Sequence, residues 1–304
     1  ASLSRLMIGA EPAALEHRPA QAGDVVLQVR DLLLPRQDAF GVDLIDVSLQ
    51  VRSGEVVGIA GVSGNGQQEL LRALSGEDTR AQPAMVQVTG QDVARLGPQQ
   101  RRALGLHFVP EERLGRGAVP TMGLAHNLLL TRNDAVGAMG WLHLGQLKAQ
   151  ARAIIERFGV KAGGADAPAR SLSGGNLQKF IVGREIAAQP KLIIIAQPTW
   201  GVDVGAAAQI HAEILALRDA GCAVLIVSEE LDELFELSDR LYVLAKGHLS
   251  PSVARADATV QQVGEWMSGL WNADVQQHLA DMEQVLPSSE AAQANALVKG
   301  PQHV

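Results

Sequence analysis

The chain has 304 residues, 47% hydrophobic and 19% charged, and its 33 acidic and 26 basic side chains give a net charge of −7. This size and composition are typical of one or two globular domains with a sizeable core, and the acidic balance argues against binding nucleic acid through its phosphates. The single cysteine, Cys222, excludes an internal disulfide framework and a zinc site built from cysteines.

The N-terminal part of the chain predicts strands around a glycine-rich loop. Residues 1–23 show little hydrophobic periodicity and are expected to be a linker. Three short runs rich in Val, Ile and Leu follow between 25 and 61 and predict strands. The third run, 55–60, is apolar on both faces, which is typical of a strand buried inside a sheet. The glycine loop, residues 61–66, then leads into a predicted helix that Gly76 is placed to end.

A helical insertion and then a strand–helix alternation make up the rest. From about 112 to 170, apolar residues recur at helical spacing with few strand signals. The alternation after it is typical of a parallel sheet with crossover helices. Its strands are predicted over 192–195, 223–227 and 241–244, and helices over 206–219 and about 259–271, with a tail from 287 that has little to bury.

The glycine loop has the chemistry of a phosphate site, but only in part. Backbone N–H groups between a strand and a helix can hold an anion, and Gly61 and Gly66 fit the nucleotide-loop pattern G-x-x-x-x-G-K-[ST]. The Lys and the hydroxyl residue of that pattern are replaced by Gln67 and Gln68. An ordinary tight turn therefore stays an open alternative for the loop taken alone.

The second motif is more specific. The segment LSGGNLQK, residues 172–179, leads into a helix predicted to end before Pro190. Ser173 can cap this helix, while Gly174 and Gly175 leave its first amides open to a phosphate. After the apolar strand at 192–195 the chain continues with Ala-Gln-Pro-Thr, and the tripeptide Gly-Val-Asp ends at Asp203.

In this order the motifs resemble those of the nucleotide-binding domains of ABC transporters, with LSGGN as the signature, 192–197 as the Walker B strand and GVD as the D-loop. The resemblance covers about residues 24–250. Four segments narrow it to the second half of tandem ATPase subunits of simple-sugar and nucleoside importers: GVSGNGQ (61–67), VPEER (109–113), AQPT (196–199) and VSEELDE (227–233). Met7, Ile8 and Gly9 are similar to the end of the connection from the first half, so we expect a C-terminal domain.

The resemblance implies a fold and a division of the chain. The fold is α/β, with a P-loop NTPase-like core, an antiparallel β subdomain and a helical subdomain. The division is a linker remnant at 1–23, the ATPase-like core at 24–110 and 186–257, the helical (signature) subdomain at 111–185, and a C-terminal helix with a flexible tail at 258–304.

The resemblance also implies which residues would bind nucleotide. The positions on the chain's own loop are Gly61, Ser63, Gly64, Asn65, Gly66, Gln67 and Gln68. The signature positions are Leu172, Ser173, Gly174, Gly175, Asn176 and Gln178, and Asp203 is the D-loop position. The six positions where the family places catalytic or metal-binding groups are all replaced, by Gln67, Gln68, Glu111, Ala196, Gln197 and Glu229. Without a metal ligand or a general base, hydrolysis on this loop is expected to be negligible, and no metal site is predicted.

The implied role is therefore that of a signature donor. ABC domains pair head to tail, so LSGGN would cover ATP with Mg²⁺ held by the N-terminal nucleotide-binding half of the same subunit, and nucleotide on the chain's own loop stays an open question. The other implied partners are an integral-membrane permease and, indirectly, an extracytoplasmic substrate-binding protein, with no nucleic acid. No segment reaches the roughly 20 apolar residues of a membrane span, so a peripheral place on the cytoplasmic face of the membrane is expected.

Two other functions stay open at this point, a non-transport ABC ATPase and a scaffold half that has lost nucleotide. The first would have complete catalytic residues, and the second would not need LSGGN. Several residues also have two interpretations. Glu111 is a hinge or a solvated acid, and Glu112, Arg113 and Arg116 are surface charge or permease contacts.

Further expectations concern individual side chains and one acidic stretch. Phe40 can stack on adenine, Cys222 is expected in the core, and the acidic stretch 229–236 is expected to be the solvated face of a short helix. His107, His126, His143 and His211 show no metal-ligand spacing. Trp200, between the Walker B strand and the D-loop, has no role that the sequence explains.

Overall fold

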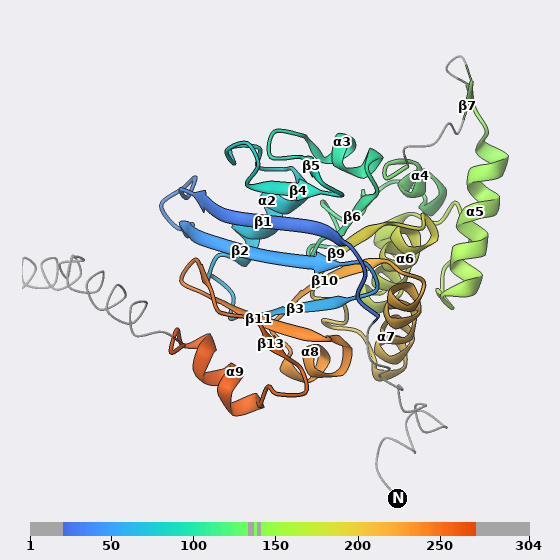
Figure 1. The fold of residues 1–304 in the computed structure, drawn as a ribbon. Helices are drawn as coiled ribbons and strands as arrows, with labels where there is room; N and C mark the ends of the chain where they lie inside the picture. The colour runs from blue at the N-terminus through green and yellow to red at the C-terminus, as the bar shows by residue number, and fades with distance from the viewer. Residues whose placement is uncertain (1–20, 133–136, 139–140, 272–304) are drawn as a thin grey trace, which may run out of the picture.

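The computed structural model describes residues 21–132, 137–138 and 141–271 (Figure 1). A seven-stranded sheet has the order β12-β11-β3-β10-β9-β6, with β13 also paired to β11, and a four-stranded sheet has the order β2-β1-β4-β5. The larger sheet comprises β3 (Val56–Ala60), β6 (Leu106–Val109), β9 (Leu192–Ala196), β10 (Ala223–Ser228), β11 (Arg240–Ala245), β12 (His248–Leu249) and β13 (Val253–Ala254). The smaller comprises β1 (Val25–Leu34), β2 (Leu44–Arg52), β4 (Val86–Val88) and β5 (Gln91–Asp92).

The larger sheet is parallel at its centre and buried on both faces. Strands β11, β3, β10, β9 and β6 run parallel, whereas β12 and β13 are antiparallel to β11. In β9, Ile193 and Ile195 belong to one hydrophobic cluster, while Leu192 and Ile194 belong to another on the opposite face. Strand side chains alternate between faces, so a strand covered on both sides is apolar throughout.

Each face of this sheet has a different cover. The antiparallel sheet and α2 (Gln67–Ser75) share one cluster with it, and the helical part of the chain shares the other. In Figure 1, β1 and β2 lie to one side of the parallel strands, and α4, α5 and α6 gather at the opposite end. The remaining helices are α3 (Pro98–Ala103), α4 (Leu124–Leu129), α5 (Leu144–Arg157), α6 (Gly174–Ala187), α7 (Val204–Asp219), α8 (Leu231–Leu237) and α9 (Val260–Met267), with a 3₁₀ turn at Ala169–Ser171.

The α/β fold and the predicted central strands are confirmed. The helix expected after the glycine loop is α2, and Gly76 ends it in a left-handed conformation (φ 88°). The insertion is mainly helical but also carries a short hairpin, β7 (Gly137–Ala138) with β8 (Trp141–Leu142). The helix expected over 259–271 is shorter, since α9 ends at Met267 before Gly269 with φ 86°.

One boundary of the predicted division falls inside a helix, and its two ends lie largely outside the described residues. The subdomain boundary expected at 185/186 falls inside α6, so the division stays a prediction. Residues 1–20 and 272–304, which include most of the expected linker and the expected tail, lie outside the described residues. Within the described residues, no helix has the length and apolarity to cross a membrane.

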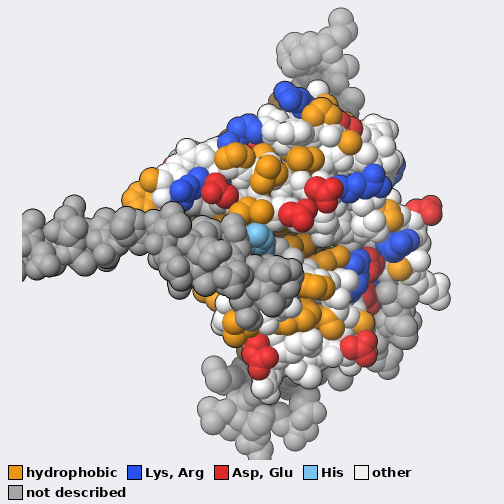
Figure 2. Space-filling view, turned by 60° about the vertical axis from the view of Figure 1, so that its left-hand side comes forward, with side chains coloured by type: hydrophobic (Ala, Val, Ile, Leu, Met, Phe, Trp, Pro, Cys, Tyr) orange, Lys and Arg blue, Asp and Glu red, His pale blue; other side chains and the backbone are white. Residues whose placement is uncertain are grey.

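Charge of both signs is spread over the visible surface. On the face that Figure 2 shows, Lys and Arg side chains alternate with Asp and Glu side chains, and apolar side chains lie between them. This face carries no continuous basic field, in keeping with the net charge of −7.

Candidate nucleotide site and signature surface

The glycine loop leaves β3 at Ala60 and enters α2 at Gln67. Gly66 has φ 106°, a left-handed conformation that favours glycine, and an added Cβ there would lie 3.1 Å from Leu44 Cδ2. At Gly61 an added Cβ would lie 2.6 Å from the carbonyl oxygen of Leu244. The backbone therefore needs glycine at both ends of the loop, as the nucleotide-loop pattern predicts.

The side chain of Gln67 folds over this loop. Its Nε2 donates to the carbonyl oxygen of Val62 (2.7 Å), and its Oε1 accepts from the backbone N–H of Asn65 (3.0 Å). That N–H is one of the donors that the loop would offer to a phosphate. The Asn65 side chain in turn accepts from the backbone N–H of Lys246 (2.8 Å), which ties the loop to the turn after β11. The Gln67 side chain thus occupies part of the space inside the loop.

The positions for a metal ion do not suit one. Mg²⁺ prefers oxygen ligands, usually carboxylate and substrate phosphate. Ala196, at the end of β9, has no side-chain oxygen, and the exposed Gln68 offers only a neutral amide. Within the part of the chain that the structure describes, no cluster of His, Cys, Asp and Glu could hold a metal ion. The residues present therefore do not fit Mg²⁺ on this loop.

Gln197 links the ends of two neighbouring strands. It follows β9 with a left-handed backbone (φ 49°), and its Oε1 accepts from Ser228 Oγ (3.2 Å) and from the backbone N–H of Glu229 (3.3 Å). Positive φ in a residue other than glycine is strained and tends to occur at functional sites. An amide cannot take up a proton, so Gln197 cannot act as a general base.

Glu233 corrects the expectation for the acidic stretch 229–236. It is only 4% exposed, and it accepts from Thr199 Oγ1 (2.5 Å) and Ser228 Oγ (2.8 Å) and lies 3.2 Å from His211 Nε2. Of this stretch, Glu229, Glu230, Asp232 and Glu236 are exposed as expected. The sequence analysis missed Glu233 because acidic residues surround it and the whole stretch was expected to be solvated. Its place on α8 beside the buried Leu234 and Leu237 does indicate the inner face of the helix.

Glu111 lies between a solvated acid and a buried one. Burial raises its pKa, and the nearby carboxylates of Glu112 and Glu229 raise it further, whereas Arg116 opposes them. Glu111 and Glu229, two of the six replaced positions, therefore lie close enough for their charges to interact. Glu111 is thus half-buried and not fully solvated, and its role as a hinge stays a prediction.

The signature segment, residues 172–178, leads into the first turns of α6, and its exposed part is Ser173 and Gly174. The expected cap is confirmed, since Ser173 Oγ accepts from the backbone N–H and the Nδ2 of Asn176 (3.5 and 2.8 Å). Ser173 and Gly174 are exposed, so the first amides of this 14-residue helix are open to solvent. Asp203 caps α7 by accepting from the backbone N–H of Ala206 (2.9 Å).

The signature segment and the D-loop segment, residues 200–203, lie in contact. A Cβ added at Gly175 would be 3.6 Å from Val202 Cα, and one added at Gly174 would be 4.0 Å from the carbonyl oxygen of Gly201. The glycine loop, the signature segment and the D-loop segment are thus three backbone surfaces of one domain.

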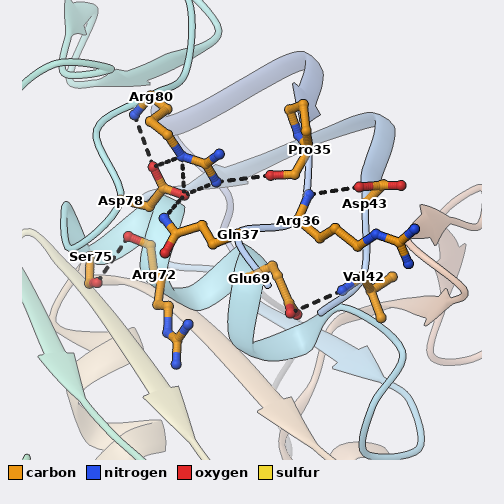
Figure 3. Close-up of polar contacts among 10 residues, drawn as sticks. All are labelled: Pro35, Arg36, Gln37, Val42, Asp43, Glu69, Arg72, Ser75, Asp78 and Arg80. Atoms are coloured by element: carbon orange, nitrogen blue, oxygen red, sulfur yellow. Dashed lines mark hydrogen bonds and ion pairs between the residues drawn. The ribbon is translucent and has the colours of Figure 1, made fainter. Parts of the chain in front are cut away.

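The loop that carries Phe40 is fixed to α2, as Figure 3 shows. Glu69 of α2 accepts from the backbone N–H of Val42 (3.2 Å), and Gln37 donates to Asp78 (3.0 Å), which also binds Arg80. Phe40 itself is 99% exposed. Its stacking on a base therefore stays a prediction, but the loop that would present the ring is held in place.

The arrangement defines the class of protein. A parallel sheet with a glycine loop, an antiparallel sheet and a signature helix is the architecture of an ATP-binding cassette. The fold matches the ADP conformation of the cassette MJ1267 with a TM-score of 0.62 and 22% identity, over 84% of this chain and 99% of that one. A nucleotide-free cassette matches with a TM-score of 0.63 and 22% identity, over 83% and 97%.

Sequence comparison gives the family. A family model described as ABC transporter matches residues 44–200, so the chain belongs to the ABC transporter family. The guanosine import ATP-binding protein NupO of Bacillus subtilis is 39% identical over 88% of this chain and 52% of its own length. The nucleoside import protein NupA of Lactococcus lactis is 37% identical over 88% and 53%, and the ribose import protein RbsA 1 of Rubrobacter xylanophilus 36% over 86% and 51%. The chain spans about half the length of the curated relatives that it matches.

Proposed function

We propose that this chain is the second, degenerate nucleotide-binding half of a tandem ABC importer ATPase for a nucleoside or a simple sugar. Its role is to supply the signature segment to ATP bound by a catalytically intact first half. The relatives named as guanosine, nucleoside and ribose import proteins support the transport role by their names. Each is about twice as long as the matched segment, which supports the tandem arrangement. They also support an integral-membrane permease and an extracytoplasmic binding protein as partners at the cytoplasmic face of the membrane.

The observation that carries the proposal is an asymmetry between two surfaces of one domain. The start of α6 keeps a capping Ser173, an exposed Gly174 and open amides, which is what a phosphate of a neighbouring nucleotide needs. The chain's own loop has Gln67 folded across it, and Ala196 stands where a metal-binding carboxylate is needed. The start of α6 is thus suited to cover the triphosphate of a neighbouring nucleotide, whereas the chain's own glycine loop cannot cleave one.

Hydrolysis on the chain's own loop fails for separate reasons. Gln197 cannot accept the proton of an attacking water, and its amide oxygen is already bound to Ser228 and Glu229. A general base contributes roughly a hundred- to ten-thousand-fold in rate, and the metal ion neutralises charge on the transferred phosphoryl group. Both contributions are missing. Gly61, Ser63, Gly64, Asn65, Gly66, Gln67 and Gln68 remain the proposed contacts for any nucleotide that this loop holds.

The test uses a charge placed in the signature segment. Gly175→Asp puts a carboxylate at the signature segment beside the proposed place of the partner's phosphate, and its Cβ would meet Val202 at an ordinary contact distance of 3.6 Å. Co-expressed with the intact half, the variant should lower ATP hydrolysis on the order of a hundredfold, the scale of a lost transition-state donor. Gly145→Asp on α5 is the matched control, because a Cβ there meets nothing within 4 Å, and it should leave the rate unchanged.

The chain without its partner gives the second arm. It should release phosphate from ATP no faster than buffer, with or without Mg²⁺. Brisk magnesium-dependent turnover by the purified chain would show that its own loop is catalytic and would end the proposal. Equal rates for Gly175→Asp and the wild-type chain in the mixture would show that the signature segment does not face the partner's nucleotide.

A further inference from the structure

Arg113 joins the signature helix to the D-loop segment. Its Nε donates to Gln178 Oε1 (3.1 Å), and its guanidinium carbon lies 5.9 Å from the centre of the Trp200 ring. A Cβ added at Gly174 would lie only 2.6 Å from Arg113 Nη1. The guanidinium group therefore fills the space between the first signature glycine and the indole.

Gln178 fixes the other side of this contact. It is 1% exposed, and its Nε2 donates to the carbonyl oxygen of Pro198 (2.9 Å). A glutamine amide has one oxygen and one nitrogen. Here the oxygen binds Arg113 and the nitrogen binds the connection between β9 and the D-loop segment. The side chain of Gln178, on α6, thus links Arg113 to the connection that leads from β9 into the D-loop segment.

No carboxylate of the described residues accounts for the position of Arg113. Among the ion pairs of the described residues none involves it, whereas the nearby Arg116 pairs with Glu112 (3.0 Å) and Glu77. Burial lowers the pKa of the Arg113 guanidinium. A partly buried cation held by an amide oxygen and an aromatic face uses the planar shape of arginine, for which lysine is a poor substitute.

We propose that Arg113, Gln178 and Trp200 form a clamp that holds the signature segment against the D-loop segment, so that both meet the partner's nucleotide as one rigid surface. The identity of the partner rests on the proposed function, but the clamp itself is a property of this chain. Arg113 acts through Gln178 and Gly174 and is a positioning residue. The clamp also gives Trp200 a role, as the aromatic face on which the guanidinium lies.

Hydrogen exchange tests the clamp in the 304-residue chain without a partner. The probes are the amides of Leu177 to Ile181, the first fully bonded part of α6, where Leu177 N–H donates to the carbonyl oxygen of Ser173 (2.9 Å). In Arg113→Ala these amides should exchange about tenfold faster, because a hydrogen bond to a charged group contributes at least that factor to a local equilibrium. Amides in the last two turns of α7 serve as the internal reference.

Matched variants separate the clamp from general damage. Arg116→Ala removes an arginine of the same segment that binds elsewhere, and it should leave exchange at 177–181 unchanged. Trp200→Ala should reproduce the effect of Arg113→Ala, whereas Trp200→Phe keeps an aromatic face and should restore protection. Arg113→Lys keeps the charge but loses the planar fork, so it should behave like Arg113→Ala. Wild-type exchange in both Arg113→Ala and Trp200→Ala would overturn the clamp.

A second measurement links the clamp to the partner. In the mixture with the intact half, Arg113→Ala and Trp200→Ala should each lower hydrolysis about tenfold if the exchange equilibrium carries over to the paired surface, and Trp200→Phe should restore it. The two proposals fail in different ways. If the exchange results hold but Gly175→Asp has no effect on the partner, the proposed function fails and the clamp stands. If Gly175→Asp stops hydrolysis while the clamp variants change neither readout, only the clamp fails.

Discussion

Glu185 on α6 is a carboxylate with no exposed surface, and its charge is held by three neighbours. Its Oε2 lies 2.5 Å from Arg102 Nη1 and 2.9 Å from His107 Nδ1, and its Oε1 lies 2.8 Å from Arg184 Nε. Burial by itself would raise the pKa of Glu185, but Arg184, His107 and Arg102 lower it to about 2. Burial also disfavours the charged form of Arg184 and so lowers its pKa. An arginine nevertheless stays protonated between pH 2 and pH 7.

This lowered pKa predicts a loss of stability in acid. The ordinary value of 4.5 applies to the unfolded chain, so the contribution of Glu185 is complete above that pH and is lost as the pH falls towards 2. The shift corresponds to about 3 kcal/mol. Glu185→Gln should cost about 3–5 kcal/mol at pH 7, because it leaves the buried Arg184 and the partly buried Arg102 without a counter-charge, and it should flatten the change between pH 4.5 and 2.

Urea unfolding at pH 7 and at pH 3 measures both effects. The control is Glu156→Gln on the exposed side of α5, which removes the same charge from solvent and should change the free energy of unfolding by less than about 0.5 kcal/mol. A Glu185→Gln chain as stable as the wild type at pH 7 would contradict the account of this network.

Cys222 gives a second test at the scale of one residue. Its thiol is 4% exposed, and burial raises its pKa to about 12. Because the thiolate is the reactive form, the folded chain should resist alkylation by iodoacetamide at pH 8, whereas the chain in denaturant should take up one adduct. Intact-mass spectrometry counts the adducts without ambiguity, since Cys222 is the sole cysteine of the sequence. Rapid labelling of the folded chain would show that the thiol is accessible.

At the scale of elements, α6 lies very close to the end of α5. A Cβ added at Gly183 would lie 2.6 Å from Phe158 Cδ2, and Phe158 is fully buried. Alanine favours a helix over glycine by about 1 kcal/mol, but forcing a methyl group into packed surroundings costs about 1–3 kcal/mol. The aromatic ring is closed in on all sides, so we expect the steric cost to be the larger of the two.

Gly183→Ala should therefore destabilise the chain by about 1–2 kcal/mol. Gly264→Ala on α9 is the matched substitution, because an added Cβ there meets nothing within 4 Å, and it should stabilise the chain by about 0.5–1 kcal/mol. Urea unfolding of the two variants beside the wild type decides the signs. Stabilisation by Gly183→Ala would mean that Phe158 can move aside.

The sequence predicted the elements well where a local pattern determines them. Strand β9 is apolar at every position because both of its faces are covered, and the capping positions of Ser173 and Asp203 follow from residue type. The hydrogen-bond partners of Glu233 and the contact of Trp200 could not be predicted in this way. Both depend on which side chains the sheet brings together from segments far apart in the chain, and residue type alone does not determine that.

At the scale of the whole molecule, both hydrophobic clusters share the parallel sheet. Ile193 and Ile195 face the helical side, together with Phe180 and Ile214, while Ile194 faces the side of α2 and the antiparallel sheet. Strand β9 therefore lies between the two hydrophobic clusters and packs against both. The helical segment expected as a separate subdomain has no cluster of its own in the described residues, since its buried side chains belong to the one that includes the sheet.

Because β9 packs against both clusters, we predict one cooperative unfolding transition. Ile193→Ala and Ile194→Ala remove side chains from opposite faces of β9, and each should cost about 2–5 kcal/mol because each leaves a cavity in a fully buried site. Calorimetry should show a single transition shifted downwards in both variants, with hydrogen exchange rising in α6 and in β1 alike. A variant in which α6 loses its protection from hydrogen exchange while β1 keeps it would show that the two clusters unfold separately. Strand β9 would then not couple them.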